Sequence, residues 1–244
     1  MKTFKQFIEE SIQDKGILKA LFVVGIPGAG KSYTVKQMVG SISPKVINTD
    51  RASEFLSKKI GLMVNSKNWV EIFQDSAHNI TKTSLQNYIN SMLPLFVDGT
   101  SNDISNIQHR MGILKSLGYD VGVVYVRTSL ETAKARAIER ASKIGREVDE
   151  HFIEAVFKLS EENAKYLQSE VNFYKVINND NDDLSNVEML KAFKSAQSFF
   201  NEPVQNIVGK RNLEKMKEEK LKYLSPGIVT METLENKIAG WYKQ

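Results

Sequence analysis

The stretch that decides the fold is "LFVVGIPGAGKSYTV", residues 21–35, in which an apolar run leads directly into glycines, a lysine and a hydroxyl residue. Residues 25–32 match the pattern G-x-x-x-x-G-K-[S/T]. In this pattern the glycines let the backbone wind tightly, so that successive N–H groups converge on phosphate oxygens. The helix expected to begin at Lys31 points its positive end at the same oxygens. The stretch therefore predicts a phosphate-binding loop between a buried strand and a helix.

Each residue of this loop has an expected role in binding a nucleoside triphosphate, for which we expect ATP. The ammonium group of Lys31 would reach the β- and γ-phosphates, and the hydroxyl of Ser32 would bind Mg²⁺. The other contacts to the nucleotide are expected from Gly25, Gly28, Ala29, Gly30 and Tyr33. The alternative is a glycine-rich turn with a surface lysine, but the strand before the motif and the helix after it favour the phosphate loop. A dinucleotide-binding loop is excluded because its glycine spacing differs.

Composition sets wider bounds on the protein. The chain has 244 residues, of which 41% are hydrophobic and 25% charged, and its net charge of +4 suits either an anionic ligand or a nucleic acid. It contains no cysteine, which excludes disulfides and thiolate zinc sites. The apolar run at residues 20–24 is too short to cross a bilayer, and the first residues lack the apolar segment of a signal peptide. We therefore expect a cytoplasmic protein without a membrane partner.

Short apolar runs alternate with stretches of helical periodicity along the chain. The expected strands are residues 20–24, 45–48, 95–98, 121–126 and 174–177, and the expected helices are residues 31–39, 52–59, 69–91, 104–117, 130–143, 150–168 and 184–200. This alternation predicts a three-layer α/β domain with a five-stranded parallel sheet. Residues 4–12 have the spacing of a short amphipathic helix. We expect one domain over residues 1–200, with a lid at about 136–150, and a polar helical appendage over residues 201–244.

Polar residues follow the second and third expected strands, where parallel sheets bind their ligands. Asp50 and Arg51 stand at the end of the second strand. Asp50 would take the proton from an acceptor hydroxyl, or would only cap a helix that begins at Ala52; the shared edge with the phosphate loop favours catalysis. Asp98, in "FVDGT", would hold Mg²⁺ through water or bind the acceptor together with Arg51 and Thr100. A simple turn is the alternative for Asp98 and Thr100.

Three arginines follow the fourth expected strand. Arg136 and Arg140 are four residues apart and so share one helix face, and Arg146 comes shortly after them. Such arginines can close over a triphosphate and neutralise the charge on the transferring phosphoryl group, although ordinary ion pairs with neighbouring glutamates are the alternative. After the last strand, Asn178 would contact the nucleotide base or form a turn.

Together these motifs resemble the zeta-toxin and polynucleotide-kinase-like P-loop kinases, over about residues 18–200. The resemblance rests on the loop at residues 25–32, on "INTDR", on "FVDGT" and on R-x₃-R-x₅-R in the lid region. It implies that Asp50 is the general base, that Lys31 and Ser32 bind ATP·Mg²⁺, and that Arg140 and Arg146 are lid cations. Zeta toxins often carry Glu where this chain has Asp98. The opening "MKTFKQFIEE" is similar to that of many proteins of large tailed phages, which would place the protein in a host cytoplasm.

We therefore expect a kinase that moves the γ-phosphate of ATP to a hydroxyl group. The expected acceptor is a nucleic-acid 5′ end, a modified DNA base or a nucleotide sugar. The alternatives are an ATP-hydrolysing switch that acts on a protein partner, and a binding module with a degenerate loop. The chain has no N-K-x-D guanine signature, and Asp50 provides the base that a kinase needs. The intact Lys31 and Ser32 disfavour the binding module.

Overall fold

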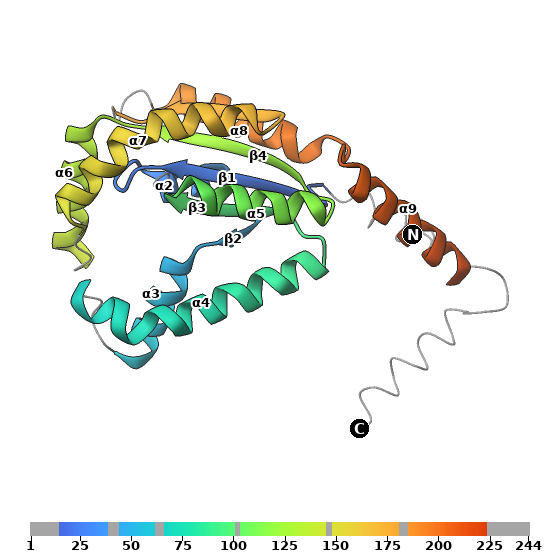
Figure 1. The fold of residues 1–244 in the computed structure, drawn as a ribbon, viewed down its shortest axis with the longest axis horizontal. Helices are drawn as coiled ribbons and strands as arrows, with labels where there is room; N and C mark the ends of the chain where they lie inside the picture. Colours follow the sequence, from blue (N-terminus) through green and yellow to red (C-terminus); the bar gives the residue numbers. More distant parts are fainter. Residues whose placement is uncertain are drawn as a thin grey trace.

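The computed structural model describes residues 15–38, 44–61, 66–100, 103–144, 148–180 and 185–223. Within these ranges a five-stranded parallel sheet lies between layers of helices (Figure 1). Across the sheet, the strands are β2 (Lys45–Ile47), β3 (Leu95–Thr100), β1 (Lys19–Gly25), β4 (Asp120–Arg127) and β5 (Phe173–Asn178). The predicted three-layer α/β fold is confirmed. The predicted amphipathic helix at residues 4–12 and the end of the predicted appendage, residues 224–244, lie outside the described residues.

The helices follow the expected alternation with the strands. They are α2 (Lys31–Met38), α3 (Thr49–Ile60), α4 (Ser66–Asn90), α5 (Ile104–Ser116), α6 (Leu130–Ile144), α7 (Glu150–Ser169), α8 (Ser185–Asn201) and α9 (Ile207–Tyr223). One boundary differs in a way that matters for the site. Helix α3 begins at Thr49, three residues before the expected start at Ala52, because Asn48 caps it.

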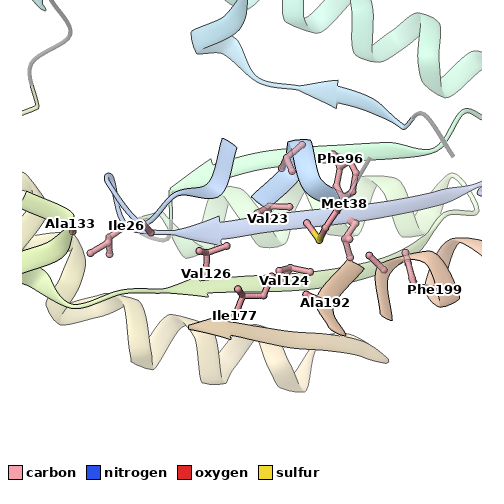
Figure 2. Close-up of a cluster of buried hydrophobic side chains, with 14 of the residues drawn as sticks. Val23, Ile26, Met38, Phe96, Val124, Val126, Ala133, Ile177, Ala192 and Phe199 are labelled. Atoms are coloured by element: carbon pink, nitrogen blue, oxygen red, sulfur yellow. The ribbon is translucent and has the colours of Figure 1, made fainter. Parts of the chain in front are cut away.

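The central strand β1 explains why the sheet needs helices on both faces. All seven of its residues are buried, and alternate residues point to opposite faces of a strand. Leu21 and Val23 pack with α2 and α8, while Phe22 and Val24 pack on the side of α5. Figure 2 shows the first of these two clusters, in which Val23 and Val124 of the sheet lie near Met38 of α2. Burial on both faces accounts for the continuous apolar run that precedes the phosphate loop.

The residues just before α9 are fixed to the end of the sheet opposite the phosphate loop. The carboxylate of Asp120, at the start of β4, accepts hydrogen bonds from the backbone N–H groups of Gln205 and Asn206. It also accepts one from Lys19 Nζ at 2.7 Å, and the Lys19 side chain is 2% exposed. From this anchor α9 points away from the body of the protein (Figure 1). The division at residue 200 stays a prediction. No helix within the described ranges is both long and apolar enough to span a bilayer.

Candidate active site

The phosphate loop connects the end of β1 to the start of α2, as its sequence predicts. Gly28 and Gly30 have φ angles of +84° and +88°, in the left-handed region that favours glycine. Neither position has room for a side chain: a Cβ atom would collide with the carbonyl oxygen of Ala133 at Gly28, and with the side-chain amide of Asn179 at Gly30. Both glycines are therefore required by backbone angle and by close packing.

A cavity of about 780 Å³ opens beside this loop, outside the carboxyl ends of the strands. It brings together most of the residues that the sequence singles out: Gly28, Gly30, Lys31, Ser32, Tyr33, Asp50, Arg51, Asp98, Arg136 and Arg140. Ala29 is a fully buried residue of the loop itself, and Asn178 is exposed at the end of β5. The side chain of Thr100 and the whole of Arg146 lie outside the described part of the structure.

Lys31 lies over the loop that it follows. Its Nζ atom donates hydrogen bonds to the carbonyl oxygens of Gly25, at 2.9 Å, and Ile26, at 3.1 Å. The ammonium group is also close enough to Asp98 to act on the pKa of that carboxyl. The sequence assigns Lys31 to the phosphates and Asp98 to Mg²⁺ or the acceptor. The charges of these two residues therefore influence each other, although they are 67 residues apart along the chain.

Asp98 is held at the end of β3 by a residue that the sequence analysis missed. Asn48 Nδ2 donates a hydrogen bond of 2.6 Å to Asp98 Oδ2. Burial raises the pKa of the Asp98 carboxyl above its ordinary value, and the charge of Asp50 adds to this effect. The charges of Lys31 and Arg51 and the bond from Asn48 act in the opposite direction. The pKa of Asp98 stays raised because desolvation disfavours the carboxylate form more than these partners favour it.

The same asparagine settles how α3 begins. Asn48 Oδ1 accepts a hydrogen bond of 3.2 Å from the backbone N–H of Arg51, which makes Asn48 the N-cap of α3. The alternative that Asp50 only caps a helix starting at Ala52 is wrong, because Asp50 lies within the first turn. An asparagine directly before Thr-Asp at a strand end was the available signal for this cap.

The loop after β5 contacts the phosphate loop through the buried side chain of Asn179. Asn179 is 6% exposed, and its Nδ2 atom donates a hydrogen bond of 2.7 Å to the carbonyl oxygen of Ala29. Its main-chain oxygen accepts a hydrogen bond of 2.6 Å from Arg136. The carboxylate of Asp180 accepts hydrogen bonds from the Ser129 backbone and the Thr128 hydroxyl at the start of α6, and the backbone bond lowers the pKa of Asp180.

Helices α6 and α7 form the far wall of the cavity. Arg136 and Arg140 line it together, as their spacing on one helix face predicts. Lys134 ties the two helices through ion pairs with Glu150, at 3.3 Å, and Glu154, at 2.5 Å. Val148 and Phe152 at the start of α7 add apolar surface to this wall.

Several other lining residues were also missed. One is Lys36 of α2, and the others form the near wall: Thr49 and Glu54 of α3, and Asp103, Asn106, Ile107 and Arg110 at the start of α5. For the residues of α5, the sequence signal was their position just after β3, because ligands bind at the carboxyl ends of parallel strands. Asp103 also caps α5, since its Oδ1 atom accepts a hydrogen bond of 2.9 Å from the Asn106 backbone.

Comparison with known proteins gives the family. The sequence model of the zeta toxin family matches residues 8–187. The chain belongs to the zeta toxin family. The expected resemblance is thereby confirmed, and the phosphate loop, β2, β3 and the cavity arginines Arg136 and Arg140 all lie within the matched residues.

Among the solved structures that are similar to this zeta toxin family member, two with TM-scores above 0.5 share its fold. One is a candidate kinase from Chloroflexus aurantiacus, with 13% identity and a TM-score of 0.55 over 75% of this chain and 98% of that one. Another belongs to the PezAT toxin–antitoxin system of Streptococcus pneumoniae, with 18% identity and a TM-score of 0.53 over 90% and 96% of the two chains. A chain of the Pnkp1/Rnl/Hen1 RNA repair complex matches with 17% identity and a TM-score of 0.47 over 64% and 46%.

Proposed function

We propose that this protein is an ATP- and Mg²⁺-dependent kinase that transfers the γ-phosphate to a hydroxyl group of a nucleic-acid or nucleotide-type substrate. The acceptor classes are a polynucleotide 5′-hydroxyl, a modified DNA base and a nucleotide sugar. One observation carries the proposal: the phosphate loop and the carboxylates of Asp50 and Asp98 line the same cavity. Membership of the zeta toxin family and the P-loop kinase fold support it.

The residues present fit ATP and Mg²⁺. The left-handed glycines and the start of α2 form a cradle of the kind that binds phosphates. Lys31 would reach the β- and γ-phosphates, and Gly25, Ala29 and Tyr33 would complete the nucleotide contacts, with Asn178 at the base. The Ser32 hydroxyl and the Asp98 carboxylate are oxygen donors of the type that Mg²⁺ prefers. Bound Mg²⁺ would neutralise negative charge on the phosphate oxygens.

The other residues have proposed roles in the transfer itself. Asp50 would accept the proton of the acceptor hydroxyl as its oxygen attacks the γ-phosphorus, with the diphosphate oxygen as the leaving group. Arg136 and Arg140, together with Arg146, would neutralise the charge on the transferring group. Arg51, Thr100 and Asp98 would orient the acceptor.

A label-transfer assay tests the proposal. Purified protein with Mg²⁺ and γ-labelled ATP would be offered 5′-hydroxyl DNA and RNA, hydroxymethylated DNA, nucleosides and UDP-amino sugars. Label should appear on one acceptor class and be lost in Lys31→Ala, whereas Asp50→Asn should reduce transfer by about 10²-fold or more while ATP still binds.

Matched controls come from α4, where Lys82 and Asp75 are exposed. Lys82→Ala and Asp75→Asn should transfer label at the rate of the unmodified protein. Label found only in free phosphate, with Asp50→Asn still active, would contradict the kinase proposal and favour an ATP-hydrolysing switch that acts on a protein partner.

A further inference from the structure

The loop that follows β5 contacts both the phosphate loop and the helix that carries the lid arginines. We propose that Asn179 is a positioning residue: its side chain orients the phosphate loop, and its main chain holds Arg136 in a fixed place relative to that loop. The inference rests on the proposed binding of a nucleoside triphosphate. It concerns a buried residue next to Asn178, the asparagine that the sequence pattern singled out.

The Asn179 side chain contacts the peptide between Ala29 and Gly30. Asn179 Nδ2 donates to the carbonyl oxygen of Ala29 at 2.7 Å. In a planar trans peptide the C=O and N–H groups point in opposite directions. Holding the Ala29 carbonyl against Asn179 therefore directs the Gly30 N–H away from Asn179. Gly30 lines the cavity, so this orientation suits a cradle of N–H groups around a phosphate.

The Asn179 side chain also fills the space beside Gly30. A Cβ atom at this position would collide with the same Nδ2 atom of Asn179. The amide group therefore packs directly against the glycine of the Gly-Lys-Ser triplet. The positive φ angle and this contact together require glycine at residue 30. The Asn179 amide and Gly30 are therefore in close contact, as a positioning role requires.

The main chain of Asn179 binds Arg136. Its guanidinium donates to the main-chain oxygen of Asn179 at 2.6 Å. That oxygen is itself well fixed, because the Asn179 N–H bonds to the carbonyl oxygen of Arg127 at 2.8 Å and so extends the pairing of β4 with β5. An arginine fork carries five N–H donors. One bond to the main chain therefore places the guanidinium while the side chain lines the cavity.

The residue after Asn179 contacts the residues that precede α6. Asp180, the next residue, accepts hydrogen bonds from the Ser129 backbone and from the Thr128 hydroxyl. It thereby fixes the first turn of the helix that carries Arg136. Two adjacent residues thus connect the phosphate loop, the arginine and its helix. A purely structural role for Asn179 would contribute to stability alone, whereas a positioning role also sets the affinity for nucleotide.

The test compares two asparagines at opposite ends of β5. Asn179→Ala removes the buried amide, and Asn172→Ala removes an exposed side chain just before the strand. Calorimetry with ATP and with ADP would give the dissociation constants, and urea unfolding would give stability. We expect Asn179→Ala to raise both dissociation constants at least about tenfold, because a misaligned cradle loses charge-assisted bonds to phosphate. Asn172→Ala should stay within about twofold.

A second variant guards against a simple packing defect. Asn179→Asp keeps the shape of the side chain and removes the donor, so at pH 8 it should weaken ATP binding at least as much as Asn179→Ala. In transfer assays the KM for ATP should rise more than kcat falls in both variants, since the main-chain oxygen that holds Arg136 remains.

The outcomes separate the two proposals. Absence of ATP binding by the unmodified protein would overturn the proposed function itself. Normal ATP binding by Asn179→Ala and Asn179→Asp, with only their stability reduced, would overturn the positioning role and leave the proposed function standing.

Discussion

Replacement of Asn48 tests how the residues that follow β2 hold Asp98 of β3 in the cavity. This side chain caps α3 through the Arg51 N–H and donates to Asp98 at 2.6 Å. Loss of an N-cap costs about 1 kcal/mol. Loss of a hydrogen bond to a carboxylate costs about 1.5–3 kcal/mol. We therefore expect Asn48→Ala to lower the free energy of unfolding by about 2.5–4 kcal/mol.

Further variants divide this sum into its two parts. In Asn48→Ser the hydroxyl still caps the helix but is too short to reach Asp98, so the loss should be about 1.5–3 kcal/mol. Asp103→Ala removes only the cap of α5 and should cost about 1 kcal/mol. Urea unfolding at pH 7, followed by the helical circular dichroism signal, measures all of these values.

A double-mutant cycle gives the decisive comparison. In an Asp98→Ala background the partner of the Asn48 amide is gone, so Asn48→Ser should cost less than about 0.5 kcal/mol. The reasoning is refuted if Asn48→Ser is as stable as the unmodified protein, or if it loses the same free energy with and without Asp98.

Three further predictions use the same unfolding measurement. The pKa of Asp98 is raised in the folded protein, so its contribution to stability is full at low pH and is lost as pH rises above about 4. Asp98→Asn should therefore gain stability relative to the unmodified protein as pH rises. A stability difference that stays constant with pH would contradict this. Lys19→Met should cost about 3–5 kcal/mol because it leaves the carboxylate of Asp120 without its buried partner. A loss below about 1 kcal/mol would show that the N–H donors of Gln205 and Asn206 suffice. Gly30→Ala and Gly61→Ala both place a side chain at a positive φ angle, at a cost of about 1–2 kcal/mol, but only Gly30→Ala also causes a collision; equal losses would contradict the close packing at Gly30.

Local chemistry made most of the fold predictable from the sequence. The buried strands are continuous apolar runs, and the phosphate loop fixes where β1 ends and α2 begins. The start of α3 was missed because two polar residues compete for one role. Asn48 and Asp50 are both good cap residues, and only the hydrogen bond from the Arg51 N–H to Asn48 shows which one caps the helix.

The loop after β5 shows a different limit of sequence reasoning. Asn178 and Asn179 are adjacent and chemically identical, yet one is exposed and the other is buried against the phosphate loop. Alternation along a strand decides which residue points inward. The edge strand β5 does not reveal its alternation, because Lys175 and Val176 are both exposed. The contact with Ala29 is separated by 150 residues in the chain, so no local pattern predicts it.

The distribution of charge in the cavity supports transfer to an acceptor over simple triphosphate binding. Among the described lining residues, the cations of the phosphate loop, α2 and α6 are Lys31, Lys36, Arg136 and Arg140. The near wall mixes both signs: Asp50, Arg51, Glu54, Asp98, Asp103 and Arg110. A site that only held a triphosphate would gain from the cations and would be weakened by carboxylates close to the phosphates. Carboxylates on the near wall are useful where a hydroxyl group must be bound and deprotonated. This distribution supports the proposed kinase, for which Asp50→Asn should separate phosphoryl transfer from ATP binding.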